Sequence, residues 1–314
     1  MTLTVIILTK NEALHIARAI GSIKTIADQI LVVDSGSTDE TVAIARGLGA
    51  TVLAHHWVNY ATQLNWAIEH VPEGTEWIMR LDADEVVQPD LANEIAGSLP
   101  KVSPDTDGIF ISRRMSFMQR PIRWGGLFPI RVLRIFRKGR GRCEMRWMDE
   151  HIIVEGATAD FRGELIDDNL NSLTWWTQKH NSYASREVID ILNQEHRFMP
   201  HETIGTLSGA TEAGVKRWLK EQVYARLPGG IRAFIYFFYR YIVRLGFLDG
   251  VQGTAFHVLQ GFWYRYLVDM KLYEVRTAMQ RDKLDVVAAI GKVLEIDLTP
   301  EGVSSRRVKR DTVL

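Results

Sequence analysis

Residues 3–23 read "LTVIILTKNEALHIARAIGSI", a β-rich run that passes directly into a helical pattern. The first part, Leu3–Thr9, is apolar and short, as expected of a buried strand. The second part, Glu12–Ile23, spaces its apolar residues at the helical period. A strand followed so closely by a helix predicts a βαβ unit and a parallel sheet.

The same alternation continues through residue 99, in repeats at 29–49, 50–71 and 76–99. The predicted fold is therefore α/β, a Rossmann-like, mainly parallel sheet with helices on both faces. Two later strands are expected at 107–117 and 130–139. A long helical pattern at 172–194 and an aromatic-rich stretch follow, so we expect one domain over 1–170 and a helical C-terminal region over 171–314.

The charge and cysteine content exclude several classes of protein. Lys plus Arg and Asp plus Glu both number 38, which gives no general case for a nucleic-acid binder. Cys143 is the only cysteine, so an internal disulfide and a cysteine-based zinc site are excluded. The start of the chain resembles a buried strand rather than a signal peptide, and no segment is a clean membrane span. The expected location is cytoplasmic.

Polar residues follow three of the predicted strands at the end where ligands bind in open α/β sheets. They form "TKNE" (9–12), "DSGSTDE" (34–40) and "DADE" (82–85). The chain contains neither a Walker loop nor a GxGxxG motif, so an ATPase cradle and a dinucleotide fingerprint are excluded.

The first two motifs have two interpretations. "DSGSTDE" is typical of a turn in which Ser37 or Thr38 caps the next helix, with acidic residues at its positive end. Alternatively, Asp34 accepts hydrogen bonds from a base or a ribose in the ligand crevice. "TKNE" could be only a helix start, but it gains weight beside Asp34.

"DADE" groups three carboxylates at a strand end. Strand alternation would put Asp82 and Asp84 on one side, where both could bind one hard cation, Mg²⁺ or Mn²⁺. Such cations are usually completed by substrate phosphates, which indicates a nucleoside diphosphate. Glu85 is expected to begin a turn and to have the weakest claim to the metal and the nucleotide. The "DTD" triplet at Asp105 lies in a turn-forming context and needs no such explanation.

"RWMDEHIIVEG" (146–156) groups Asp149, Glu150 and His151 before an apolar strand. A surface charge cluster is the default interpretation, and His151 could be an ordinary packed histidine. The alternative is a carboxylate that serves as the general base of a transferase.

The aromatic stretch from Ile231 to Leu248 also has two interpretations. It could pack as a helical hairpin, or it could form an interfacial surface on the inner face of the cytoplasmic membrane. In the second case Arg232, Arg240 and Arg244 would meet anionic phosphates.

Together, "VIILTKNEALHIARAIGSI", "ILVVDSGSTDETVAIARGLGA" and "WIMRLDADE" resemble the inverting family 2 glycosyltransferases with a GT-A fold. The resemblance is to the branch that builds lipopolysaccharide core and exopolysaccharide. "WMDEHI" is similar to that branch's Val-His-Glu segment, and "YRYIVRLGFLDGVQG" resembles its C-terminal region. At Leu64 the branch usually has a basic residue, whereas Gln63 and Asn65 match.

The resemblance implies roles for individual residues. Thr9, Glu12, Asp34 and Asp39 would line the nucleotide pocket. Asp82 would contact the ribose or the metal, Asp84 would bind the metal, and Arg80 would steady the same loop. Glu150 matches the family's glutamate and Asp149 stands where the family has histidine, so both remain candidates for the base.

The predicted function is metal-dependent transfer of a sugar from a nucleoside-diphosphate sugar to a hydroxyl of a glycan or lipid-linked glycan in cell-envelope polysaccharide synthesis. One competitor is a sugar-phosphate nucleotidyltransferase. Such an enzyme has a Gly-rich, basic loop after its first strand, and the stretch "TKNEALHIARAI" of this chain has no such loop. The other is a non-catalytic glycan- or lipid-binding protein on the same fold.

Overall fold

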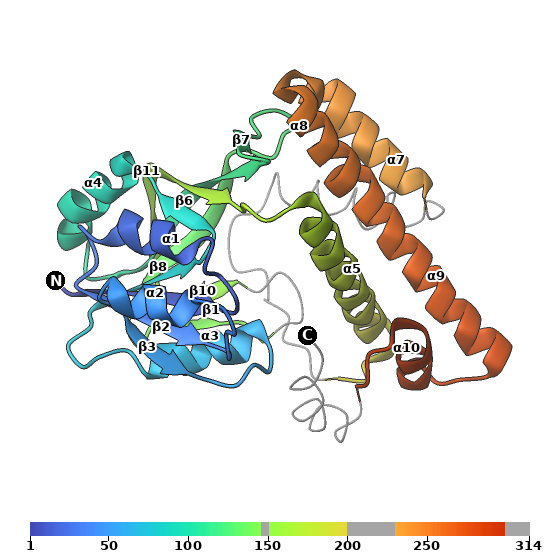
Figure 1. Cartoon of the computed structure of the whole chain (residues 1–314), viewed down its shortest axis with the longest axis horizontal. Helices are drawn as coiled ribbons and strands as arrows, with labels where there is room; N and C mark the ends of the chain where they lie inside the picture. Colours follow the sequence, from blue (N-terminus) through green and yellow to red (C-terminus); the bar gives the residue numbers. More distant parts are fainter. Residues whose placement is uncertain (146–150, 200–229, 299–314) are drawn as a thin grey trace. The chain divides into compact units, whose positions relative to one another are not determined.

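The computed structural model describes residues 1–145, 151–199 and 230–298, which fall into two compact units (Figure 1). Unit 1 contains the described residues of 1–172 and residues 239–257. Unit 2 contains the described residues of 173–238 and 258–314.

Unit 1 is built on a nine-stranded sheet with the order β3-β2-β1-β4-β8-β6-β11-β5, and β7 pairs with β6 off this path. The pairs among β1 to β4 and the pair of β6 with β11 are parallel, whereas β8 and β5 pair antiparallel with their neighbours. The strands are β1 (Leu3–Thr9), β2 (Gln29–Asp34), β3 (Thr51–Ala54), β4 (Trp77–Asp82), β5 (Glu85–Val87), β6 (Thr106–Phe117), β7 (Arg120–Pro121), β8 (Ile130–Arg137) and β11 (Ala157–Asp168).

Helices cover both faces of this sheet, as predicted, because its central strands are apolar on both sides. Alternation along β1 sends Val5 and Ile7 into the core under α1 (Ile16–Ile23), α2 (Thr41–Gly47) and α4 (Pro89–Ser98). Ile6 packs on the opposite face with α3 (Tyr60–Glu69). The mainly parallel α/β fold is therefore confirmed.

The two strands at one end of the main sheet, β11 and β5, were not predicted. β11 has twelve residues and a polar pattern, and it joins the sheet only through its long-range parallel pairing with β6. β5 has only three residues and pairs with β11. Next to β8, a separate hairpin of β9 (Gly141–Cys143) and β10 (Ile152–Val154) flanks residues 146–150.

Unit 2 is helical, which confirms the expected helical C-terminal region. It contains α5 (Leu173–His196), α7 (Ile231–Phe238), α9 (Tyr264–Asp282) and α10 (Val286–Leu294). Its core joins Val188 and Leu192 of α5 to Val275 of α9 and Ile290 of α10. Among the described helices, none combines the length and the apolar character that crossing a bilayer requires.

Residues 239–257 belong to unit 1 and consist of short turns: a π-helix at Tyr239–Val243, a 3₁₀ helix at Gly246–Asp249 and α8 at Gly250–Phe256. The three arginines that the membrane-surface interpretation brings to lipid phosphates do not share one exposed face. Arg232 is paired with Asp269 of α9, and Arg240 is 2% exposed. Of the three, only Arg244 is exposed.

Candidate functional site

The carboxyl ends of three parallel strands bring the predicted nucleotide-pocket residues together. Thr9 and Asp34 are direct partners across β1 and β2, and Leu8 is the partner of Asp82 on β4. The loops that follow these strands therefore meet at one edge of the sheet, where parallel α/β folds place their ligands.

Asp34 is 5% exposed and its carboxylate organises its own loop. Oδ1 accepts hydrogen bonds from Thr9 Oγ1 at 3.1 Å and Ser37 Oγ at 2.5 Å. Oδ2 accepts from the backbone N–H groups of Gly36 and Ser37 at 2.9 and 2.8 Å. These four bonds use the usual acceptor capacity of a carboxylate, so a ligand would have to exchange with one of the present donors to reach Asp34.

The loops after β1 and β2 are joined by further hydrogen bonds. Asn11 Oδ1 accepts from the Thr38 N–H, and the Glu12 N–H donates to Thr41 Oγ1. Asp39 accepts from the N–H groups of Ala13 and Thr41. The two predicted motifs thus form one hydrogen-bonded rim.

Asp39 fixes the start of α2, although neither Ser37 nor Thr38 caps that helix as predicted. The helix begins at Thr41, two residues beyond Asp39, whose carboxylate accepts from the Thr41 hydroxyl and N–H. Slight burial raises the pKa of Asp39, but these hydrogen bonds outweigh burial and leave the pKa below its usual value.

Glu12 connects the rim to the loop that follows β11. Its Oε2 lies 2.6 Å from His15 Nδ1, and His15 Nε2 accepts from the Leu170 N–H at 2.9 Å. Arg18 of α1 donates to Asp168 at 2.8 Å. The chain after β11 is thereby held against the loop after β1.

Asp82 is held by two arginines and a tyrosine. Its carboxylate accepts from Tyr60 Oη at 2.9 Å, from Arg134 Nη2 at 3.0 Å and from Arg80 Nε at 3.4 Å. Burial by itself raises the pKa of Asp82, but Arg80 and Arg134 outweigh burial and hold the pKa well below its usual range. Asp82 therefore stays ionised.

The prediction that Glu85 begins a turn is wrong. β4 ends at Asp82, residues 83 and 84 form the turn, and Glu85 opens β5 with a side chain that is 0% exposed. It is paired with Arg134, and its Oε2 accepts from the Asp82 N–H at 3.0 Å. Burial raises the pKa of Glu85 despite that arginine. The buried carboxylate of this motif is thus structural.

Asp84 lies in that turn and faces the end of β11. Its Oδ2 accepts from Asn169 Nδ2 at 2.9 Å, and its carbonyl accepts from the Asp168 N–H. Asp167, the β11 partner of Glu85, lies close enough that Asp84 affects its titration. Burial first, and then the Asp84 carboxylate, raise the pKa of Asp167 to about 8.

This donor set fits a cation held only partly by the protein. Among the described residues, no group of three or more His, Cys, Asp or Glu side chains could hold a metal ion. Asp84, with Asp167 nearby, offers the one or two carboxylates with which proteins usually bind Mg²⁺ beside substrate phosphates.

The two candidates for the base, Asp149 and Glu150, lie outside the described residues. The strands that flank them are described, and Cys143 of β9 pairs with Ile152 of β10. Beside this pair, Glu144 is 0% exposed and accepts from the His151 N–H at 3.0 Å and from Nδ1 at 2.8 Å. The His151 side chain is 61% exposed, so His151 is not a packed core histidine.

α3 anchors this hairpin. Asn65 exchanges two hydrogen bonds with the backbone of Cys143, at 2.9 and 2.8 Å. Leu64 is 0% exposed in the core, and Gln63 contacts His55 Nδ1 at 2.7 Å. The position at which a basic residue was expected therefore faces the core.

Sequence reasoning missed several residues of the site. The residues that contact or flank a predicted site residue, and that were not themselves predicted, are Tyr60, Arg134, Glu144, Asp167 and Asn169. The signal for Tyr60 was its place at the start of a predicted helix that follows a strand. For Arg134 and Asp167 the sequence contained no such signal, because these residues reach the site through long-range strand pairing.

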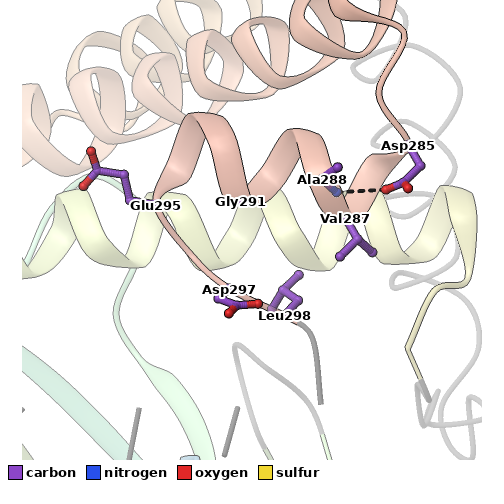
Figure 2. Close-up of a pocket in the computed structure, with 7 residues that line it drawn as sticks. All are labelled: Asp285, Val287, Ala288, Gly291, Glu295, Asp297 and Leu298. Atoms are coloured by element: carbon purple, nitrogen blue, oxygen red, sulfur yellow. Dashed lines mark hydrogen bonds between the residues drawn. The ribbon is translucent and has the colours of Figure 1, made fainter. Parts of the chain in front are cut away.

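A shallow depression of about 570 Å³ lies on unit 2 (Figure 2). It is lined by Asp285, Val287, Ala288, Gly291, Glu295, Asp297 and Leu298. Asp285 caps α10 through the Ala288 N–H at 2.8 Å. None of these residues is a predicted site residue.

Residues 4–155 match the model of Glycosyl transferase family 2. The comparisons support a family 2 glycosyltransferase. An uncharacterized glycosyltransferase of Rickettsia felis is 49% identical over 89 residues, which are 28% of this chain. That match covers only 31% of the relative's length. The lipopolysaccharide core biosynthesis glycosyltransferase LpsC of Rhizobium meliloti is 28% identical over 192 residues, which cover 59% of this chain and 70% of that protein.

Two solved structures are also similar to this chain. Mannosyl-3-phosphoglycerate synthase from Rubrobacter xylanophilus has a TM-score of 0.42 at 19% identity, over 66% of this chain and 79% of that one. Glucosyl-3-phosphoglycerate synthase from Mycobacterium tuberculosis, in complex with Mn²⁺, UDP and glucosyl-3-phosphoglycerate, has a TM-score of 0.31 at 22% identity, over 37% of this chain and 44% of that one.

Proposed function

We propose that this protein is an inverting glycosyltransferase of the GT-A type. It moves a sugar from a nucleoside-diphosphate sugar to a hydroxyl of a glycan or lipid-linked glycan. The observation that carries the proposal is the meeting of Thr9, Asp34 and Asp82 at the carboxyl ends of three adjacent strands, within a segment that matches family 2. The similarity to LpsC supports an acceptor in the cell envelope.

In this proposal the nucleotide lies over the rim formed by the loops after β1 and β2. The rim would contact the nucleotide through Thr9, Glu12, Asp34 and Asp39. Beside it, Asp82 and Arg80 would line the same site. The arginines beside Asp82 already occupy its oxygens, which favours the ribose rather than a metal as its ligand.

Asp84, with Asp167 beside it, would hold Mg²⁺ or Mn²⁺. When bound, such a cation neutralises negative charge on the departing diphosphate. Of the two predicted metal ligands, Asp84 has the better claim, because its described contacts are one amide and one backbone N–H rather than two guanidinium groups.

Asp149 or Glu150 would take the proton of the acceptor hydroxyl. The hydroxyl oxygen then forms its bond to the anomeric carbon on the face opposite the leaving group, while the bond to the diphosphate oxygen breaks. One base is sufficient for this displacement, unlike the paired carboxylates of a glycoside hydrolase. The Glu144–His151 pair and Asn65 hold the strands that flank residues 146–150 in the sequence.

The domain assignment follows from these roles. Residues 1–170 would bind the donor and carry out catalysis, and residues 171–314 would serve the acceptor side. We place the protein in the cytoplasm, where nucleotide sugars are made, with a lipid-linked acceptor at the inner face of the membrane.

A panel of sugar nucleotides tests the proposal. With Mn²⁺, one donor should raise the melting temperature, because a ligand that binds only the folded state stabilises it by about 2.7 kcal/mol at 100 times its Kd. The same donor should be hydrolysed slowly without acceptor. Binding without any hydrolysis would favour a non-catalytic glycan-binding protein, and consumption of a sugar phosphate with a nucleoside triphosphate would favour a nucleotidyltransferase. Comparing Asp149→Asn with Glu150→Gln then identifies the base.

A further inference from the structure

The segment 239–251 of unit 1 exposes an unusual number of large apolar side chains. They are Tyr239, Ile242, Val243, Leu245, Phe247, Leu248 and Val251, and Val251 is 82% exposed. Backbone hydrogen bonds keep the segment compact, from the Arg244 N–H to the Tyr239 carbonyl at 2.9 Å and from the Leu248 N–H to the Leu245 carbonyl at 3.0 Å. Several apolar groups are therefore gathered on one small part of the surface.

The inward side of the same segment is polar, which reverses the usual pattern of a surface helix. Arg240 is 2% exposed and Asp249 is 3% exposed, and His257, at the end of α8, is 0% exposed. The Arg240 guanidinium lies over the Phe256 ring at 5.5 Å. The exposed apolar residues of this segment therefore do not contribute to the core of unit 1. Such patches mark interaction sites.

Asp249 uses its carboxylate to attach a second loop to this segment. Its two oxygens accept from the N–H groups of Arg123 and Trp124, each at 3.0 Å. The Gly125 N–H donates to the Arg244 carbonyl at 2.9 Å. A Cβ at Gly125 would lie 2.2 Å from the His257 ring, so only glycine fits this approach. Trp124, 42% exposed, is thereby fixed next to the apolar segment.

The exposed charged side chains of the two attached segments have one sign. Between residues 231 and 268 the only acid is Asp249, and it is buried. The exposed charged side chains of the two attached segments are Arg120, Arg123 and Arg244. The Arg120 guanidinium lies about 3.5 Å from the place of a Cβ on Gly250, so it borders the apolar residues.

We propose that residues 118–124 and 239–251 form a docking surface for the anionic headgroup layer of a membrane. Exposed aliphatic and aromatic side chains would enter the interface, Trp124 would lie at headgroup level, and the three arginines would contact lipid phosphates. A second copy of this chain would bring the same arginines face to face, which disfavours a dimer here. The proposal does not require the glycosyl transfer, although docking would bring the enzyme to a lipid-linked acceptor.

Vesicle binding of the full chain tests the proposal. The vesicles are phosphatidylcholine alone or phosphatidylcholine with phosphatidylglycerol, and the bound fraction is measured by co-sedimentation. Val243→Ser/Leu248→Ser/Val251→Ser removes apolar groups from the surface, and Val251→Ser alone is the milder version. The matched control is Leu173→Ser/Tyr273→Ser, which changes residues of unit 2 that are 43% and 67% exposed. Arg120→Gln/Arg123→Gln removes charge only.

The wild type should bind anionic vesicles and release them at high salt. The triple variant should lower the partition coefficient by about tenfold or more. Burial of even one aliphatic side chain of this size changes a partition coefficient by about tenfold. The control should bind like the wild type, and the arginine variant should lose the preference for anionic vesicles. The proposal is overturned if the wild type does not bind, if the triple variant binds normally, or if it instead converts a dimer into a monomer in light scattering.

Stabilisation by a sugar nucleotide separates this proposal from the proposed function. The triple variant should be stabilised by the donor as the wild type is, because none of its changes lies at the rim. A wild type that binds vesicles but no nucleotide would contradict the proposed function and leave the docking surface standing.

Discussion

Arg134 Nη2 lies 3.0 Å from Asp82 Oδ2, although 52 residues separate the two in the chain. The same nitrogen is paired with Glu85, which is 0% exposed. One guanidinium from β8 thus compensates two of the three carboxylates in "DADE". This relationship leaves Asp84 as the carboxylate of the motif that Arg134 does not compensate.

Arg134→Met should destabilise the protein strongly. Removing one partner of a buried ion pair leaves an uncompensated charge and typically costs about 3–5 kcal/mol. Denaturant unfolding measures the loss. Arg131→Met is the matched control, because Arg131 is paired with Asp160 where both side chains are more than half exposed, and such pairs contribute about 0–1 kcal/mol. Equal losses for the two variants would show that Arg134 has no special role.

Asp167 should make the stability of the metal-free protein fall with rising pH. Burial and Asp84 raise its pKa to about 8, whereas an unfolded Asp titrates near 3.9. Between these values the folded state holds a proton that the unfolded state has released. The free energy of unfolding should therefore decline as pH rises, on the order of 1 kcal/mol per pH unit.

Asp167→Asn should reduce this decline, and the raised pKa of Glu85 accounts for the part that remains. The measurement is urea unfolding from about pH 5 to about pH 8, for both proteins, with a chelator present. Identical pH slopes for the variant and the wild type would mean that Asp167 titrates normally.

Leu64→Arg should unfold the protein rather than add a contact to the donor phosphate. Leu64 is 0% exposed on the core-facing side of α3, so an arginine there would be a buried, unpaired charge. Leu64→Ala is the comparison variant, and it should lower the free energy of unfolding by about 2–5 kcal/mol. A soluble, folded Leu64→Arg variant with tighter donor binding would contradict this prediction.

Asn65→Ala should slow the transfer more than it weakens donor binding. It removes two hydrogen bonds to Cys143 and frees the hairpin beside the proposed base, at a stability cost of about 1–3 kcal/mol. Steady-state kinetics should show a lower kcat with a KM for the donor close to that of the wild type. If KM rises and kcat stays the same, the hairpin serves donor binding instead.

The sequence was sufficient for the parts of the site that are local in the chain. Thr9, Asp34 and Asp82 each end an apolar strand, and parallel pairing of adjacent βαβ units brings strand ends together without further information. The local pattern also showed the helices on both faces of the sheet.

The remaining parts depend on contacts that no local pattern encodes. β11 has a polar sequence and becomes a strand only through its pairing with β6, and it carries Asp167 to the side of Asp84. Glu85 was misplaced because strand alternation was continued past Asp82, where β4 already ends. Arg240 and Asp249 lie on the inner side of an apolar segment, whereas charges on such a segment are normally expected outside.

The most direct test of the account compares Asp84→Asn with Asp105→Asn in metal-dependent turnover of the donor. Asp105 is an exposed carboxylate of the second Asp-x-Asp triplet and lies outside the site. The account predicts that Asp84→Asn lowers turnover by about 100-fold or more, because the cation that would neutralise the developing charge is bound less well, while Asp105→Asn retains full activity. Near-normal, metal-dependent turnover by Asp84→Asn would contradict the account.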